Sequence, residues 1–116
     1  MSGMGERILI VDDEEPMREI MAAILQHEGY ECLCVPNGVD AMKLLESGEK
    51  FDLITSDICN EPMWGETFIN TVRQRYPDTP TVVVTGCRDI PGALHKGNNL
   101  EREQIIEVVR RKLGAA

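Results

Sequence analysis

Short β-branched runs alternate with amphipathic segments along the chain. Residues 8–11 read Ile-Leu-Ile-Val without a polar position, which is typical of a strand covered on both faces. Acidic residues and Pro16 follow, and both suit the first turn of a helix. The next apolar residues recur at the spacing of one helix face and are Met17, Ile20, Met21, Ile24 and Leu25. Gly29 is expected to end this helix.

The same alternation continues to the end of the chain. Further strands are predicted at residues 32–35, 51–56 and 81–85. Further helices are predicted around Ala41–Leu45, around Phe68–Val72 and from about Leu100 to Leu113, the last with Asn98 or Asn99 as its cap. Strands that alternate with helices pair in parallel through right-handed crossovers, so the pattern predicts an α/β fold with a doubly wound parallel sheet. The length of 116 residues suits one domain over residues 1–116.

The composition excludes several classes of function. A net charge of −8 opposes binding to nucleic acid or to an anionic membrane, because both need a basic protein surface. No stretch is long and apolar enough to cross a bilayer, and the N-terminal residues lack the layout of a signal peptide, so we expect a cytoplasmic protein. The cysteines lack metal-binding spacing and are expected to be free thiols that fill apolar space; they are Cys32, Cys34, Cys59 and Cys87.

Polar side chains stand where three of the predicted strands end. Asp12 and Asp13 follow the first strand, Asp57 follows the third, and Thr85 ends the fourth. Ligands of such sheets bind beyond the carboxyl ends of the strands, so these side chains converge if the first and third strands are neighbours. Close carboxylates repel unless a cation is present, and Mg²⁺ suits oxygen ligands of this kind. With a hydroxyl and an ammonium nearby, the set suffices for phosphoryl transfer to a carboxylate.

Each of these residues also has an ordinary structural interpretation. Asp12 and Asp13 alone suit a helix cap better than a functional site. Asp57 alone suits a turn equally well, and Thr85 alone suits a strand better. Their joint placement at three strand ends favours a functional site.

Four segments together resemble the response-regulator receiver domains (CheY-like) of two-component signalling. Residues 8–14 look like the opening strand of that family with its acidic residues, and residues 51–58 followed by Gly65 resemble its phosphorylation-site strand and loop. Residues 36–38 are similar to the turn into its second helix, and residues 82–86 to its fourth strand with a terminal hydroxyl. The resemblance implies a flavodoxin-like sheet with strand order 2-1-3-4-5.

The resemblance also implies a role for each site residue. Asp57 would accept the phosphoryl group, and Mg²⁺ would be held by Asp13, Asp57 and the backbone carbonyl of Cys59. Asp12 would act mainly through a metal-bound water, and Thr85 would be the switch hydroxyl. Such a domain is expected to be no enzyme beyond self-catalysed phosphorylation and dephosphorylation. Its expected partners are a sensor histidine kinase or phosphotransfer protein and an unidentified downstream protein.

The chain departs from the family after Thr85. Only residues 86–95 lie between Thr85 and Lys96, where the family places a fourth helix and a fifth strand. A parallel crossover usually takes a dozen or more residues. We therefore expect the fourth helix to be missing or unwound, with no regular helix of two turns or more between residues 86 and 97. The fifth-strand region would begin at residues 92–93. A collapsed loop, a strand in altered pairing, and a segment exchanged within a homodimer are three open outcomes.

Lys96 and Ala93 bear on how much of the family's mechanism survives in that segment. Lys96 is aligned with the phosphate-binding lysine of the family, and a solvated loop lysine remains the alternative. Ala93 stands where the family carries an aromatic switch residue, so the usual coupling between hydroxyl and ring is in question.

Three functions compete on these observations. The leading hypothesis is a phosphoacceptor signalling domain, which the acidic residues favour. A pseudo-receiver, an interaction module that works without phosphorylation, is favoured by the shortened segment. A metal-dependent phosphatase would need an Asp-x-Asp motif after the first strand, and residues 12–14 read Asp-Asp-Glu instead.

Overall fold

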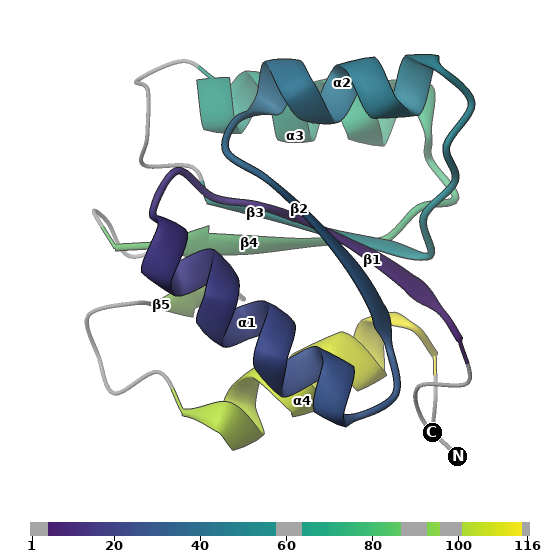
Figure 1. Ribbon diagram of the computed structural model, residues 1–116. Coiled ribbons are helices and arrows are strands. Elements are labelled where there is room, and N and C mark those ends of the chain that lie inside the picture. Colours follow the sequence, from purple (N-terminus) through teal and green to yellow (C-terminus); the bar gives the residue numbers. More distant parts are fainter. Residues whose placement is uncertain (1–4, 58–63, 87–92, 96–100, 115–116) are drawn as a thin grey trace.

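Five parallel strands form one sheet in the computed structural model, which describes residues 5–57, 64–86, 93–95 and 101–114. The strands are β1 (Arg7–Val11), β2 (Glu31–Val35), β3 (Leu53–Asp57), β4 (Thr81–Thr85) and β5 (Leu94–His95). Their order across the sheet is β2-β1-β3-β4-β5, and every neighbouring pair is parallel (Figure 1). The predicted α/β fold and its strand order are therefore confirmed.

Helices cover both faces of this sheet. Within the described residues they are α1 (Glu15–His27), α2 (Gly38–Glu46), α3 (Trp64–Arg75) and α4 (Arg102–Lys112). Figure 1 shows α1 and α4 on one face and α2 and α3 on the other. No helix in the described part of the chain has both the length and the apolar character needed to cross a membrane.

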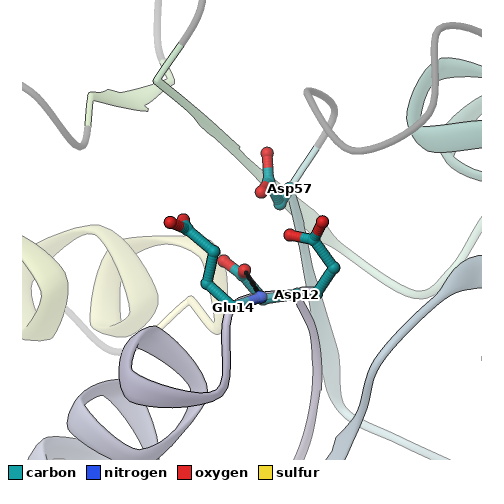
Figure 2. Close-up of side chains that lie close together, drawn as sticks. Asp12, Glu14 and Asp57 are labelled. Carbon is teal, nitrogen blue, oxygen red and sulfur yellow. Dashed lines mark hydrogen bonds between the residues drawn. The ribbon is translucent and has the colours of Figure 1, made fainter.

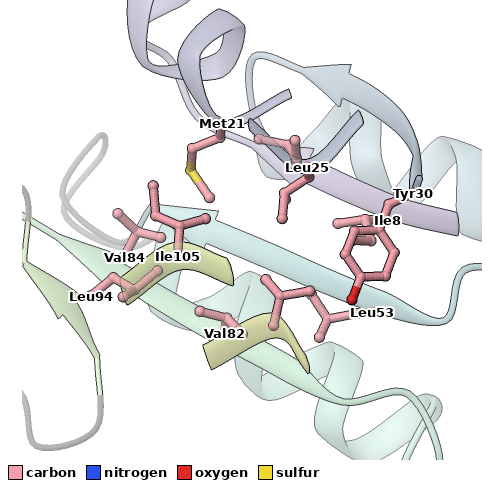
Figure 3. Packing of buried hydrophobic residues seen from close by; sticks show 11 residues of the cluster. Ile8, Met21, Leu25, Tyr30, Leu53, Val82, Val84, Leu94 and Ile105 are labelled. Atoms are coloured by element: carbon pink, nitrogen blue, oxygen red, sulfur yellow. The ribbon is translucent and has the colours of Figure 1, made fainter. Parts of the chain in front are cut away.

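Successive residues of the central strands point to opposite faces and divide the core into two clusters. On β1, Ile8 and Ile10 pack with residues of α1 and α4, whereas Leu9 and Val11 pack with residues of α2 and α3. Because both faces of the strand are buried, its sequence is a continuous apolar run instead of an alternation. Figure 3 shows the first cluster, which includes Met21, Leu25, Tyr30, Leu53, Val82, Val84, Leu94 and Ile105.

The first helix agrees with its predicted signals except at one residue. Pro16 lies in the first turn of α1, and Gly29 follows the helix with a φ of 95° while its N–H donates to Gln26 O at 3.0 Å. Such a positive φ is a conformation that glycine adopts without steric cost. Ile20 is the exception, because it belongs to the predicted apolar stripe and yet is 52% exposed.

The last helix begins later than predicted and has a different cap. The helix α4 starts at Arg102, and its cap is Glu101, in place of Asn98 or Asn99, which lie outside the described residues. The backbone N–H of Glu101 donates to Gln104 Oε1 at 2.9 Å. An acceptor three residues into the helix thus satisfies the backbone at its start, as in a capping box.

The fifth strand keeps its place in the sheet although it is only two residues long. Leu94 aligns with Val84 and His95 with Thr85 in parallel register, at the ordinary edge position beside β4. Residues 93–95 therefore show neither a collapsed loop nor a strand in altered pairing. No described residue between β4 and β5 is helical. The predicted absence of a two-turn helix falls mostly on residues 87–92 and 96–97, which lie outside the described residues.

The two described cysteines fill space beside the core. Cys32 and Cys34 are free thiols on β2, half-buried, and both pack against the first cluster. Burial is the main cause that raises the pKa of Cys32, to about 12, and it also raises the pKa of Cys34. Both observations agree with the predicted role of small apolar fillers. Cys59 and Cys87 lie outside the described residues.

Replacing Leu94 tests whether the short β5 strand is part of the core. Leu94 is 5% exposed and belongs to the first cluster, so Leu94→Ala is expected to lower the free energy of unfolding by about 2–4 kcal/mol in urea denaturation. Ile20→Ala on the exposed side of α1 is the control and should cost less than about 1 kcal/mol. Equal costs for the two variants would contradict the packing of β5 against the core.

Candidate functional site

Three of the predicted site residues meet at the carboxyl edge of the sheet. Asp12 directly follows β1, Asp57 is the last residue of β3, and Thr85 is the last residue of β4. These strands are neighbours, and their registers align Val11 with Ser56 and Asp57 with Val84. Asp12, Asp57 and Thr85 are almost fully buried, with exposures of 1%, 3% and 0%. The predicted convergence at this edge is thus observed.

Four carboxylates come together at this edge. One oxygen from each of Asp12, Asp13, Glu14 and Asp57 can be chosen so that all lie within 4.8 Å of one another. Asp12 and Asp57 are buried, whereas Asp13 and Glu14 are exposed. Figure 2 shows Asp12 and Glu14 from the β1–α1 junction and Asp57 from β3 around one space. The predicted acidic set is therefore present, with one member more.

Glu14 is the residue that the sequence interpretation missed. It lies in the acidic run before Pro16, which was attributed to the first turn of the helix. Glu14 is the N-cap residue of α1, but its side chain makes no capping hydrogen bond. The available signal was a third acid directly after Asp12 and Asp13.

Backbone contacts hold the β1–α1 junction in a defined shape. Asp12 N–H donates to Val35 O at 3.1 Å, which continues the contact between β1 and β2 beyond the strand end. The N–H of Glu14 donates to Asp12 Oδ1 at 2.8 Å (Figure 2). Asp12 therefore accepts from the N–H of the N-cap residue Glu14, which is a turn contact and not the predicted helix cap, and it still contributes its carboxylate to the cluster.

A divalent cation suits this arrangement of oxygens. Two carboxylates 4.8 Å apart repel by about 3 kcal/mol at an effective dielectric constant of about 20, and solvent screens the exposed members further. Hard cations such as Mg²⁺ take oxygen ligands, and Mg²⁺ usually contacts one or two carboxylates while it keeps several waters. The donor set fits such an ion, with some carboxylates acting through water.

Two other predicted site residues, Lys96 and Cys59, lie outside the described residues. Lys96 was assigned to phosphate binding and the Cys59 carbonyl to metal binding. Trp64 begins α3, and its side chain is likewise outside the described part. The geometry at the sheet edge is therefore that of the four acids and Thr85.

Comparison with known proteins decides the family. Residues 8–106 match the family model of the response regulator receiver domain. This chain belongs to that family. The matched region contains all four carboxylates and Thr85, so the predicted resemblance is confirmed over most of the receiver domain.

Individual relatives and solved structures agree with this assignment. The hydrogenase transcriptional regulatory protein HoxA of Bradyrhizobium diazoefficiens is 35% identical over 82 residues, which are 68% of this chain and 16% of the relative. A CheY-like receiver domain protein from Methanospirillum hungatei has a TM-score of 0.83 at 25% identity, covering 95% of this chain and 94% of that structure. Chemotaxis response regulator CheY4 of Vibrio cholerae has a TM-score of 0.79 at 26% identity, covering 93% and 98%. The receiver-domain chain spans about a fifth of the length of the curated relatives it matches.

Addition of Mg²⁺ to the receiver domain is expected to stabilise it through the four carboxylates. A ligand at about 100 times its dissociation constant adds about 2.7 kcal/mol to the free energy of unfolding. Thermal unfolding with MgCl₂, compared with NaCl at the same ionic strength, measures this gain. Mg²⁺ should stabilise Asp57→Asn clearly less than the wild type. Asp78 is an exposed acid outside the cluster, so Mg²⁺ should stabilise Asp78→Asn as much as the wild type. Equal gains for both variants would contradict an ion site at this edge.

Proposed function

We propose that this receiver domain accepts a phosphoryl group on Asp57 from a sensor histidine kinase or a phosphotransfer protein, in a reaction that depends on Mg²⁺. The observation that carries the proposal is the buried Asp57 carboxylate at the end of β3, gathered with three further carboxylates. Membership in the receiver family supports this assignment of the nucleophile. The domain is proposed to work in the cytoplasm, where its kinase would present the phosphohistidine.

The chemistry at Asp57 requires little beyond position and charge neutralisation. A carboxylate oxygen of Asp57 attacks phosphorus, the new O–P bond forms, and the P–N bond to the donor histidine breaks with its electron pair left on the ring nitrogen. Mg²⁺, when bound, supplies charge neutralisation for the phosphoryl oxygens. Asp13, Asp57 and the Cys59 carbonyl are the proposed ligands, and Asp12 is proposed to act through a bound water.

Thr85 and Lys96 are proposed to contact the phosphoryl oxygens. Thr85 ends the strand beside Asp57 and is fully buried, so its hydroxyl is suited to donate to one oxygen. The ammonium of Lys96 would act as a point charge on another oxygen. Apart from formation and hydrolysis of its own phosphoaspartate, the domain is proposed to turn over no substrate.

One observation favours the pseudo-receiver as a second candidate. Only residues 86–93 join β4 to β5, fewer than a parallel crossover usually has, and β5 is two residues long. In a phosphorylated receiver domain, this segment would transmit the response to the downstream partner. The partner that responds could be a downstream protein, or a second copy of this chain in a homodimer.

Phosphorylation with a small donor separates the two candidates. Incubation with acetyl phosphate and Mg²⁺, followed by intact mass measurement, should give an adduct of one phosphoryl group on the wild type and on Asp78→Asn. Asp57→Ala should give none, because the nucleophile is gone. Beryllium fluoride with Mg²⁺ should change the fluorescence of Trp64 in the wild type but not in Asp57→Ala. No adduct on the wild type, or an undiminished adduct on Asp57→Ala, would refute the phosphoacceptor function.

Replacing Lys96 distinguishes a phosphate-binding lysine from a solvated loop lysine. If its charge stabilises the phosphoryl oxygens, Lys96→Met should slow adduct formation from acetyl phosphate by about 100-fold. Lys50→Met, an exposed lysine of the loop before β3, serves as the matched control and should leave the rate unchanged. Equal rates for both variants would assign Lys96 to the solvated loop.

A further inference from the structure

Arg18 reaches from α1 back to the strand end that carries the acidic pair. Its Nη1 donates to the backbone carbonyl of Asp12 at 2.5 Å, and the side chain is partly buried. Glu14 and Glu15 stand four and three residues before it, at the spacing that favours ion pairs on a helix. The described contact of the guanidinium is the one with the Asp12 carbonyl. Its charge is therefore directed at the junction itself.

This contact is one of three described hydrogen bonds that restrain Asp12. The N–H of Asp12 donates to Val35 O, its Oδ1 accepts from the N–H of Glu14, and its carbonyl accepts from Arg18. Each restraint comes from a different element or turn: β2, the helix cap and the body of α1. Since the peptide unit is planar, holding the carbonyl of Asp12 also orients the N–H of Asp13. Arg18 thus influences the orientation of the side chains of both Asp12 and Asp13.

The charge of Arg18 adds to its geometric effect. The guanidinium is a cationic donor, and hydrogen bonds from a charged donor are stronger than neutral ones. Its partner carbonyl belongs to a member of the four-carboxylate cluster. A positive charge held at this carbonyl offsets part of the repulsion among the carboxylates.

We propose that Arg18 is a positioning residue for divalent-ion binding and thereby for phosphoryl acceptance. It acts through Asp12 and Asp13 and does not itself touch the ion or the phosphoryl group. The inference rests on the proposed ion site at Asp13 and Asp57. Loss of a group that orients metal ligands from outside typically weakens metal binding by about 10–100-fold, which sets the effect to be measured.

Direct titration of Mg²⁺ tests this role in the full chain. Calorimetry at fixed ionic strength should give a dissociation constant about 10-fold larger for Arg18→Met than for the wild type. Arg18→Lys should recover most of the affinity, because an ammonium on a long side chain reaches the same carbonyl. Arg75→Met removes an arginine whose partner is Glu46, outside the acidic cluster, and should leave the affinity unchanged. Arg18→Gln replaces Arg18→Met if the latter does not fold.

Two results for Arg18→Met would overturn the proposal. If Arg18→Met unfolds more easily in the absence of Mg²⁺ but binds the ion as tightly as the wild type, Arg18 serves stability alone. If it binds Mg²⁺ more tightly, Arg18 acts as a repelling charge and not as a positioning residue. A wild type that binds Mg²⁺ but forms no adduct on Asp57 would remove the proposed function and leave this test of Arg18 valid. A wild type that binds no Mg²⁺ would overturn the inference together with the ion site.

Discussion

The parallel pairing of β1 with β3 is the constraint on which the site depends. It aligns Val11 with Ser56, so that the acids that follow β1 meet Asp57 at one edge of the sheet. The pairing must hold against the repulsion of carboxylates, about 3 kcal/mol for one close pair in the partly solvated edge. Ile8, Leu9, Leu53 and Ile54 are completely buried beneath it, and each such side chain contributes about 1.5–3 kcal/mol. Two apolar faces therefore hold an acidic edge in place.

The same residues explain which features could be predicted from the sequence. Continuous apolar runs such as residues 8–11 predict doubly covered strands, and acids directly after them predict a polar edge. That the first and third strands are neighbours followed from the family resemblance, because periodicity alone does not order strands. The strands and Asp57 were thus accessible before the structure, and the sheet order was accessible through the family.

The sequence predictions were wrong where the structure depends on the direction of a side chain or on competing hydrogen bonds. Glu14 was attributed to the helix, and only its observed direction places it among the carboxylates. Asn98 and Asn99 are better capping residues than Glu101 by propensity, but Gln104 supplies an acceptor for the Glu101 N–H and shifts the start of α4. Ile20 shares the helical spacing of the core residues and still faces solvent. The spacing of apolar residues predicts the helix, but it does not predict how wide the buried face of the helix is.

The acidic edge of the sheet and the short strand β5 differ in how they contact the helices. Leu94 anchors β5 in the cluster shared with α1 and α4. On β4, Val82 and Val84 are buried on that side, whereas Val83, facing α2 and α3, is only half-buried. Among the described hydrogen bonds, those that join the acidic cluster to a helix run to α1, through Glu14 and Arg18. Asp12, at the acidic edge, is therefore joined by hydrogen bonds to the start of α1.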